Sequence, residues 1–178
     1  MLPIIDLFIC MCYSIHNLFI LLIPPKKLGF MIKKKEIVME DTIYKRFEHT
    51  ADIGIQIVSD SMSELYLNAG FALIDSITYT ESLNGISQRI VKIDADNPQE
   101  LLMNWLRELL SFWVIDDLFV MPKDMQSISE THLSCLCFVT EFDPTHHDIK
   151  NDIKAVTYHD LDVSYHNGKW QTKIIFDV

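Results

Sequence analysis

Residues 97–115, which read NPQELLMNWLRELLSFWVI, decide the fold. Asn97 suits the N-cap of a helix, Pro98 the first helical position and Glu100 the third. Apolar residues then recur at helical spacing, at Leu101, Leu102, Trp105, Leu106, Leu109, Leu110 and Trp113. Because this apolar stripe is wide, we expect the helix to end near Ile115 and to be the central element of the core.

Most of the remaining body of the chain alternates as strands do. Strands are predicted at 44–48, 53–58 and 86–93 before this helix, and at 132–142, 152–165 and 170–178 after it. A loop containing Pro122 is expected after the helix, and Asn167-Gly168 predicts a tight hairpin because both residues tolerate positive φ.

A second helix is predicted between the second and third of these strands. It starts at Ser61 or Ser63 and runs to about Ile74, and with Ser61 as the N-cap, Glu64 completes a capping box. Residues 75–84 are polar and predict a loop. The sequence therefore predicts an α+β fold in which two helices pack on a mainly antiparallel sheet.

Composition excludes several classes of protein. The chain has 178 residues, 15 Lys and Arg against 25 Asp and Glu, a net charge of −10, and 49% hydrophobic residues. It is long enough to bury a core and too apolar to be disordered. The acidic balance argues against direct binding to nucleic acid through a basic patch. If the protein acts on RNA or DNA, we expect it to do so through a partner protein.

Residues 1–40 differ from the rest. They carry a formal charge of +2, against −12 for residues 41–178. Residues 7–23 hold no charged side chain, and lysines follow at Lys26, Lys27 and 33–35. The segment can be a weak membrane anchor, a processed leader or sequence upstream of the true start. We favour the third interpretation, because compact acidic sequence begins right after Met39, and we place the folded domain at 41–178.

The four cysteines form two C-x-C pairs, Cys10 with Cys12 and Cys135 with Cys137. Cys135 and Cys137 fall two residues apart on a predicted strand, so they point to the same face and are best read as two small buried thiols. No second pair with zinc-ligand spacing exists, and nothing suggests a disulfide framework. This cysteine usage fits a reducing, cytoplasmic location.

Two acids lie where predicted strands begin or end. Asp52 precedes an apolar strand, and Asp177 stands one residue before the chain's own α-carboxylate on Val178. Two anions that close repel each other unless a cation or basic group neutralises them, and oxygen clusters of this kind bind Ca²⁺ or Mg²⁺. Two plainer alternatives stay open: Asp52 only bonds turn amides, and the terminus frays with both charges solvated.

The histidines do not define an active site by themselves. His146 and His147 fall in a loop after Asp143-Pro144, where adjacent histidines are more often exposed polar residues than ligands. His159 lies within a predicted strand, where an orienting hydrogen bond is as probable as catalysis. The sequence contains no nucleophile elbow, Walker loop, dinucleotide fingerprint or zincin motif.

Four stretches taken together resemble one family. They are FEHTADIG at 47–54, LMNWLRELL at 102–110, IKAVTYH at 153–159 and IIFDV at 174–178. This pattern is similar to the archease family over essentially all of residues 43–178. It does not extend over 1–40, which archeases generally lack.

The resemblance implies a small cytosolic or nuclear protein that serves an RtcB-type RNA ligase in tRNA splicing and RNA repair. It implies that the protein promotes guanylation of the ligase from GTP, without a chemical step of its own. GTP and RNA would be reached only through the ligase, and membrane association is not expected. It also implies a divalent metal, Ca²⁺, Mg²⁺ or Mn²⁺, held by Asp52, Asp177 and the terminal carboxylate of Val178.

Further polar residues of the loop before KAVTYH contribute to activity in the family, and here this loop offers His146, His147 and Asp152. Two other functions compete with the ligase activator. A metal-dependent phosphoester hydrolase is suggested by the same acids together with His49 and His159. A generic chaperone-like binding module is suggested by the acidity and the missing catalytic motif. We rank the activator first, then the hydrolase, then the binding module.

Overall fold

Helix α2 (Pro98–Asp116) begins where the sequence predicts and lies in the middle of the fold. The side chain of Asn97 accepts the amide hydrogen of Glu100 at 2.9 Å, and Glu100 accepts the amide of Asp96 at 3.2 Å. Trp105 is fully buried and donates its indole N–H to the carbonyl of Tyr66 at 3.0 Å. Helix α2 is thus capped at its start and bonded to the other helix at its centre.

The structure is a computed structural model and describes residues 43–49, 52–85 and 87–178, which all fall within the compact unit Glu40–Val178. The interpretations of residues 1–40, and of Cys10 and Cys12, lie outside the described residues. Among the residues that are described, no helix is both long and apolar enough to cross a membrane.

The described strands form two sheets. The first has the order β1 (Lys45–His49), β2 (Asp52–Ser59), β7 (Lys169–Asp177), β6 (Ala155–His166). The second has the order β3 (Ser87–Asp94), β5 (His132–Glu141), β4 (Leu118–Ile128). Every pairing in the two sheets is antiparallel. The predicted α+β class with two helices and antiparallel strands is confirmed.

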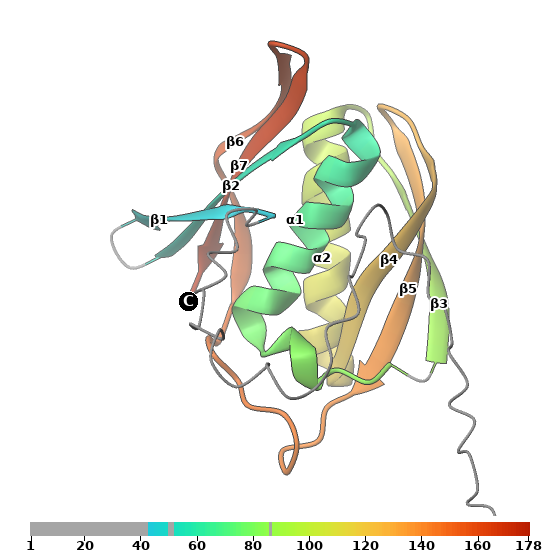
Figure 1. Cartoon of the computed structure of the whole chain (residues 1–178), viewed down its shortest axis with the longest axis vertical. Coiled ribbons are helices and arrows are strands. Elements are labelled where there is room, and N and C mark those ends of the chain that lie inside the picture. The colour runs from blue at the N-terminus through green and yellow to red at the C-terminus, as the bar shows by residue number, and fades with distance from the viewer. Residues whose placement is uncertain (1–42, 50–51, 86) are drawn as a thin grey trace, which may run out of the picture. The chain divides into compact units, whose positions relative to one another are not determined.

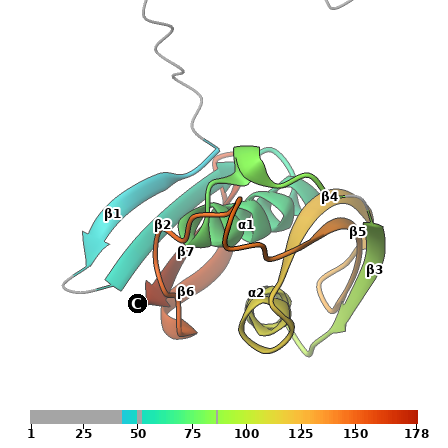
Figure 2. The ribbon, with the colours of Figure 1, turned by 90° about the horizontal axis from the view of Figure 1, so that it is seen from below.

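The two helices lie between the two sheets, as Figures 1 and 2 show. Helix α1 (Met62–Ile77) contacts β2 and β4, and α2 contacts β6 and β4. One sheet contributes buried residues such as Ile55 and Phe176, and the other contributes Phe119, Cys135 and Cys137. A helix covered on two sides must be apolar over much of its surface, which explains the wide stripe of α2. Cys135 and Cys137 are the buried, unbridged thiols that their spacing predicts.

The expected loop around Pro122 is wrong, because Pro122 lies inside β4. Strand β4 is at the edge of its sheet, and its register with β5 shifts between Pro122 and Asp124. Proline has no amide hydrogen to give to a ladder, so it is tolerated at an edge strand or a bulge, and β4 offers both.

Helix α1 starts as predicted but ends later than predicted. Ser61 is its N-cap and accepts the amide of Glu64 at 3.1 Å, while Glu64 accepts the amide of Asp60 at 3.0 Å. The helix continues to Ile77, so residues 75–77 are not loop. Ile77 is fully buried, and this last apolar contact outweighs the polar character of the surrounding sequence. A short 3₁₀ turn at Thr80–Ser82 follows.

The hairpin between β6 and β7 has the predicted turn. Asn167 has φ of 51° and Gly168 has φ of 79°, so both central residues adopt the left-handed conformation that this class of turn requires. The turn sets the register in which Tyr165 faces Trp170, and this register holds as far as the pair of Asp162 with Lys173.

We expect Asn97→Ala to lower the free energy of unfolding by about 1 kcal/mol, because the Glu100 amide loses its acceptor. Urea denaturation followed by circular dichroism measures this loss. Asn97→Ser is the matched control and should keep most of the stability, since serine also caps. Equal stability of Asn97→Ala and the unchanged protein would contradict the role of the cap.

Candidate functional site at the end of the central strands

The register between β2 and β7 brings the two predicted site acids together. Ile53 pairs with Phe176 at the end of this register, and Asp52 and Asp177 are the adjoining residues of the two strands. Asp177 is exposed, whereas Asp52 and Val178 are partly buried. The two side-chain carboxylates and the terminal carboxylate therefore belong to one end of the four-stranded sheet, where the C-terminus is marked in Figure 1.

The end of β7 is held from both sides, which does not fit a frayed terminus. Ala155 of β6 pairs with Asp177, and the amide of Lys154 donates to the Asp177 carbonyl at 2.9 Å. On the other side, β2 pairs with β7 from Ile53 to Ser59. The last residues of the chain are consequently fixed in position by two neighbouring strands.

These carboxylates form a donor set made only of oxygen. Hard cations such as Ca²⁺, Mg²⁺ and Mn²⁺ prefer oxygen ligands, whereas zinc sites usually include nitrogen or sulfur. Among the described residues, no three His, Cys, Asp or Glu side chains are grouped to hold a metal ion. The third ligand at this end of the sheet would therefore have to be the α-carboxylate of Val178.

The charge of Asp177 is not balanced by an ion pair with another described residue, because the salt bridges of this part of the chain involve other acids. Two carboxylates and a chain terminus at one strand end repel each other unless a cation lies among them. The oxygen ligands that these residues offer are of the type that a divalent cation would prefer.

The loop between β5 and β6 contains the other three predicted residues. His147 is 9% exposed, its Nδ1 accepts the Asp143 amide at 3.0 Å, and its ring packs edge-on against Phe119 at 5.7 Å between centroids. His146 is exposed, with its Nδ1 2.7 Å from a carboxylate oxygen of Asp143. Asp152 is also exposed. His147 therefore packs inside the loop, while His146 and Asp152 are available at its surface.

Asp143 organises the start of this loop. Its carboxylate accepts hydrogen bonds from the hydroxyl of Thr145 at 2.7 Å and from the Thr145 amide at 2.8 Å. These bonds, followed by the contact with His146, hold the pKa of Asp143 well below its usual range. A hollow of about 1040 Å³ lies beside it and is lined in part by Glu141, His146 and His147.

Sequence reasoning missed Asp75, which joins three parts of the fold. Its carboxylate accepts the ammonium of Lys150 at 2.9 Å, accepts the hydroxyl of Tyr44, and lies 3.8 Å from Arg46. Burial, together with the bond to Asp75, raises the pKa of Tyr44. Asn151 donates to the Ser76 carbonyl at 2.7 Å, so the β5–β6 loop also covers the end of α1. No local sequence motif predicts this cluster, because its members are far apart in the sequence.

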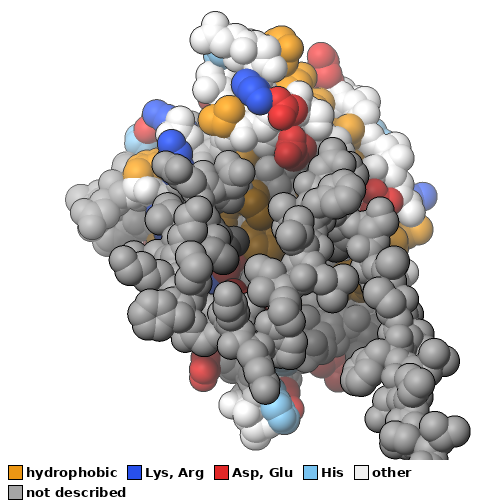
Figure 3. All heavy atoms as spheres, in the orientation of Figure 1, with side chains coloured by type: hydrophobic (Ala, Val, Ile, Leu, Met, Phe, Trp, Pro, Cys, Tyr) orange, Lys and Arg blue, Asp and Glu red, His pale blue; other side chains and the backbone are white. Residues whose placement is uncertain are grey.

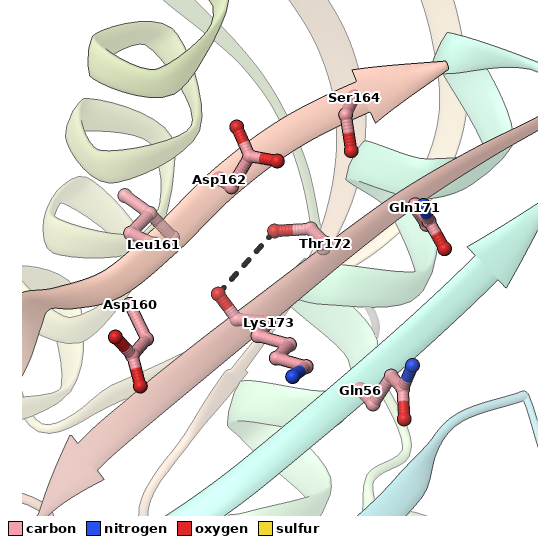
Figure 4. A pocket seen from close by; sticks show the side chains of 8 residues that line it. All are labelled: Gln56, Asp160, Leu161, Asp162, Ser164, Gln171, Thr172 and Lys173. Carbon is pink, nitrogen blue, oxygen red and sulfur yellow. Dashed lines mark hydrogen bonds between the residues drawn. The ribbon is translucent and has the colours of Figure 1, made fainter. Parts of the chain in front are cut away.

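The four-stranded sheet carries a polar groove of about 630 Å³, shown in Figure 4. Gln56, Asp162 and Lys173 come from three neighbouring strands and line it together. The register of β6 shifts between Thr157 and Asp162, and within this bulge Asp160 has φ of 55°. His159 lies in the same bulge, 3.6 Å from the carboxylate of Asp160. The groove contains both signs of charge and none of the predicted metal ligands.

The face drawn in Figure 3 shows its described Lys and Arg side chains as separate spots among acidic and apolar ones.

A family model described as "Archease protein family (MTH1598/TM1083)" matches residues 44–178. The chain belongs to the archease family. The match covers all the described elements, and it confirms the resemblance that the four sequence stretches suggest. Because it starts at residue 44, it does not include residues 1–40.

Curated archeases and solved archease structures agree with this assignment. Protein archease of Pyrococcus abyssi is 30% identical over 140 residues, covering 76% of this chain and 98% of its own. Protein archease of Methanosarcina mazei is 29% identical over 139 residues, covering 76% of this chain and 95% of its own. The solution structure of Methanobacterium thermoautotrophicum protein 1598 has a TM-score of 0.66 at 25% identity, covering 76% of this chain and 99% of its own.

A crystal structure from Thermotoga maritima, described as an archease and possible chaperone, shares the fold with a TM-score of 0.53 at 20% identity. It covers 78% of this chain and 99% of its own. The archease fold is therefore shared over the whole length of these solved relatives.

Gly54 lies in β2, two residues after Asp52, and its missing side chain leaves room for the aromatic ring of Phe47. A Cβ at Gly54 would lie 2.3 Å from the ring of Phe47, which faces it across β1 and β2. We expect Gly54→Ala to cost about 1–3 kcal/mol of folding free energy through overpacking. Urea denaturation of a double-mutant cycle with Phe47→Ala measures the effect. The cost should shrink when the ring is absent, and an equal cost in both backgrounds would exclude the clash.

Proposed function

We propose that this archease is a metal-binding activator of an RtcB-type RNA ligase, which it helps to become guanylated during tRNA splicing and RNA repair in the cytoplasm. Membership of the family supports the proposal. The observation that supports it most is the β2–β7 pairing, because Asp52 and Asp177 adjoin its last pair, Ile53 with Phe176, and Asp177 precedes the chain terminus. A negatively charged strand end that is fixed in position suits a protein that acts at the active site of another protein.

The proposed metal ligands are Asp52, Asp177 and the α-carboxylate of Val178. A divalent cation bound there supplies positive charge that can be placed near a triphosphate. The chain itself binds and positions the ion: β6 fixes the Asp177 backbone through Lys154, and β2 holds Asp52 in register. The protein contributes geometry and charge in this account, and the ligase performs the covalent steps on GTP and RNA.

The β5–β6 loop is proposed as the second active element. Its exposed residues His146 and Asp152 can contact the ligase directly, whereas the buried His147 holds the loop in shape by accepting the Asp143 amide. The bonds from Lys150 and Asn151 to the end of α1 keep this loop from moving freely. Substitution of His147 should thus act through loop structure, and substitution of His146 through contact with the partner.

A chaperone-like function is the second candidate, because the Thermotoga maritima relative is described as a possible chaperone. The two proposals differ in selectivity. An activator binds one ligase and raises its turnover, whereas a chaperone-like module binds many unfolded proteins with no preference for that ligase.

We expect Asp177→Asn to abolish stimulation of multiple-turnover RNA ligation at limiting GTP while leaving the thermal unfolding midpoint nearly unchanged. The side chain of Asp177 is exposed, so its neutralisation removes a metal ligand without disturbing the core. Two glycines added after Val178 should act similarly, because they move the terminal carboxylate away. Asp162→Asn, an exposed acid of the polar groove, is the matched control. Full stimulation by both site variants would reject the proposal.

We also expect the isolated protein to bind Mn²⁺ or Ca²⁺ in isothermal titration calorimetry with one ion per chain. The double variant Asp52→Asn/Asp177→Asn should weaken binding by more than about tenfold, or about 1.4 kcal/mol, because two charged oxygen ligands are lost. Asp143→Asn serves as a control in the β5–β6 loop. If Asp143→Asn removes binding and the double variant does not, the metal site lies in the loop instead.

A further inference from the structure

A small groove lies between the last turns of α2 and the start of β6. Its volume is about 290 Å³, and its lining includes Val114 and Ile115 of α2 and Ala155 and Val156 of β6. Val114 is 60% exposed and Ile115 is 75% exposed, whereas the apolar stripe of α2 from Leu101 to Leu110 is buried. Two large apolar side chains at neighbouring positions are thus open to solvent beside a sheet.

The wall of this groove formed by β6 is the edge of the four-stranded sheet. In the described part of the chain β6 pairs with β7 alone, so its other edge has no strand beside it. The register shift after Thr157 bends the strand, and bulges of this kind limit edge-to-edge pairing. Only the short segment before the bulge, which forms the groove, can receive an additional extended strand.

The charge of the groove is opposite to that of the protein. Its lining includes Arg107 and Lys154 and no acidic residue, although residues 41–178 carry a formal charge of −12. Arg107 is held in place because its guanidinium lies over the ring of Tyr158, 4.9 Å from the centroid. An apolar floor with two cations at its rim suits an extended peptide that carries apolar side chains and a carboxylate.

The groove is also joined directly to the proposed metal site. Lys154 is one of the residues that line the groove, and its amide donates to the carbonyl of Asp177. A partner segment seated here would therefore lie within one residue of the strand end that holds the acids. Ala155 at the start of β6 pairs with Asp177, and Figure 2 shows β6 between the C-terminus and α2.

We propose that this groove, formed by Val114, Ile115, Arg107 and Lys154, is where an extended, acidic and apolar segment of the RNA ligase docks as an added strand on β6. The identity of the partner rests on the proposed function. The groove supplies affinity and orientation, and the cation proposed at the neighbouring strand end would supply the activating charge.

The test separates docking from activation. Binding of the full chain to the purified ligase is measured by calorimetry, and ligation is measured over a range of archease concentrations. Val114→Glu/Ile115→Glu should weaken binding by at least about tenfold and shift half-maximal stimulation equally, while saturating protein restores the full plateau. Ile90→Glu, which replaces an apolar side chain 51% exposed on β3, is the matched control and should change neither.

Arg107→Ala provides a second variant that does not depend on burying a new charge. It should weaken binding at low salt and make binding less sensitive to added salt, because one attractive charge is removed. Circular dichroism melts establish that both variants fold. Unchanged affinity of the folded glutamate variant would overturn the docking proposal, as would an equal loss in Ile90→Glu.

The two proposals fail in different ways. If Asp177→Asn abolishes stimulation while the groove variants bind normally, the ligase activator stands and the groove inference falls. If the unchanged protein binds through the groove yet never stimulates ligation, the activator role falls and the docking site stands. If the protein instead forms a dimer that the glutamate variant dissociates, the groove is a self-association site and the ligase inference is wrong.

Discussion

The rest of the structure depends on the antiparallel pairing of the last strand, β7, between β2 and β6. A C-terminal strand at the centre of a sheet cannot shift by one residue without turning Ile174 and Phe176 out of the core, so its register is strongly fixed. That register ends at the pair of Ile53 with Phe176, so Asp52 and Asp177 lie at the same end of the two strands, and Val178 follows Asp177. Core packing thereby sets the geometry of the acidic strand end.

The two helices pack against both sheets and so stabilise the domain around this pairing. Helix α2 is buried over most of its length because the two sheets cover it from different sides, and only its last turn emerges at the groove beside β6. At the other helix, Asp75 of α1 holds two neighbouring segments in place. Lys150 links the β5–β6 loop to Asp75, and Tyr44, just before the edge strand β1, donates its hydroxyl to Asp75. Both candidate functional regions are therefore mounted on rigid elements.

Much of this fold could be predicted because its signals are local. The caps of Asn97 and Ser61, the Asn167-Gly168 turn and the alternating strands depend on neighbouring residues only. The division of the strands into two sheets, the place of Pro122 in an edge strand and the role of Asp75 depend on contacts between distant segments, which a single sequence does not reveal. Asp52 and Asp177 were predicted as site residues from their position at strand ends and from the family resemblance, and this assignment stays a prediction. The burial of His147 was not predicted, because it results from packing against Phe119.

We propose that a divalent cation is bound by the acids at the start of β2 and the end of β7. A crystal structure of the full chain grown with Mn²⁺, with the ion located by anomalous scattering, tests this claim most directly. We predict an ion within about 2.0–2.6 Å of carboxylate oxygens from Asp52, Asp177 and Val178. An ion bound instead at Asp143 and His146, or an ordered strand end with no ion at saturating Mn²⁺, would contradict the account.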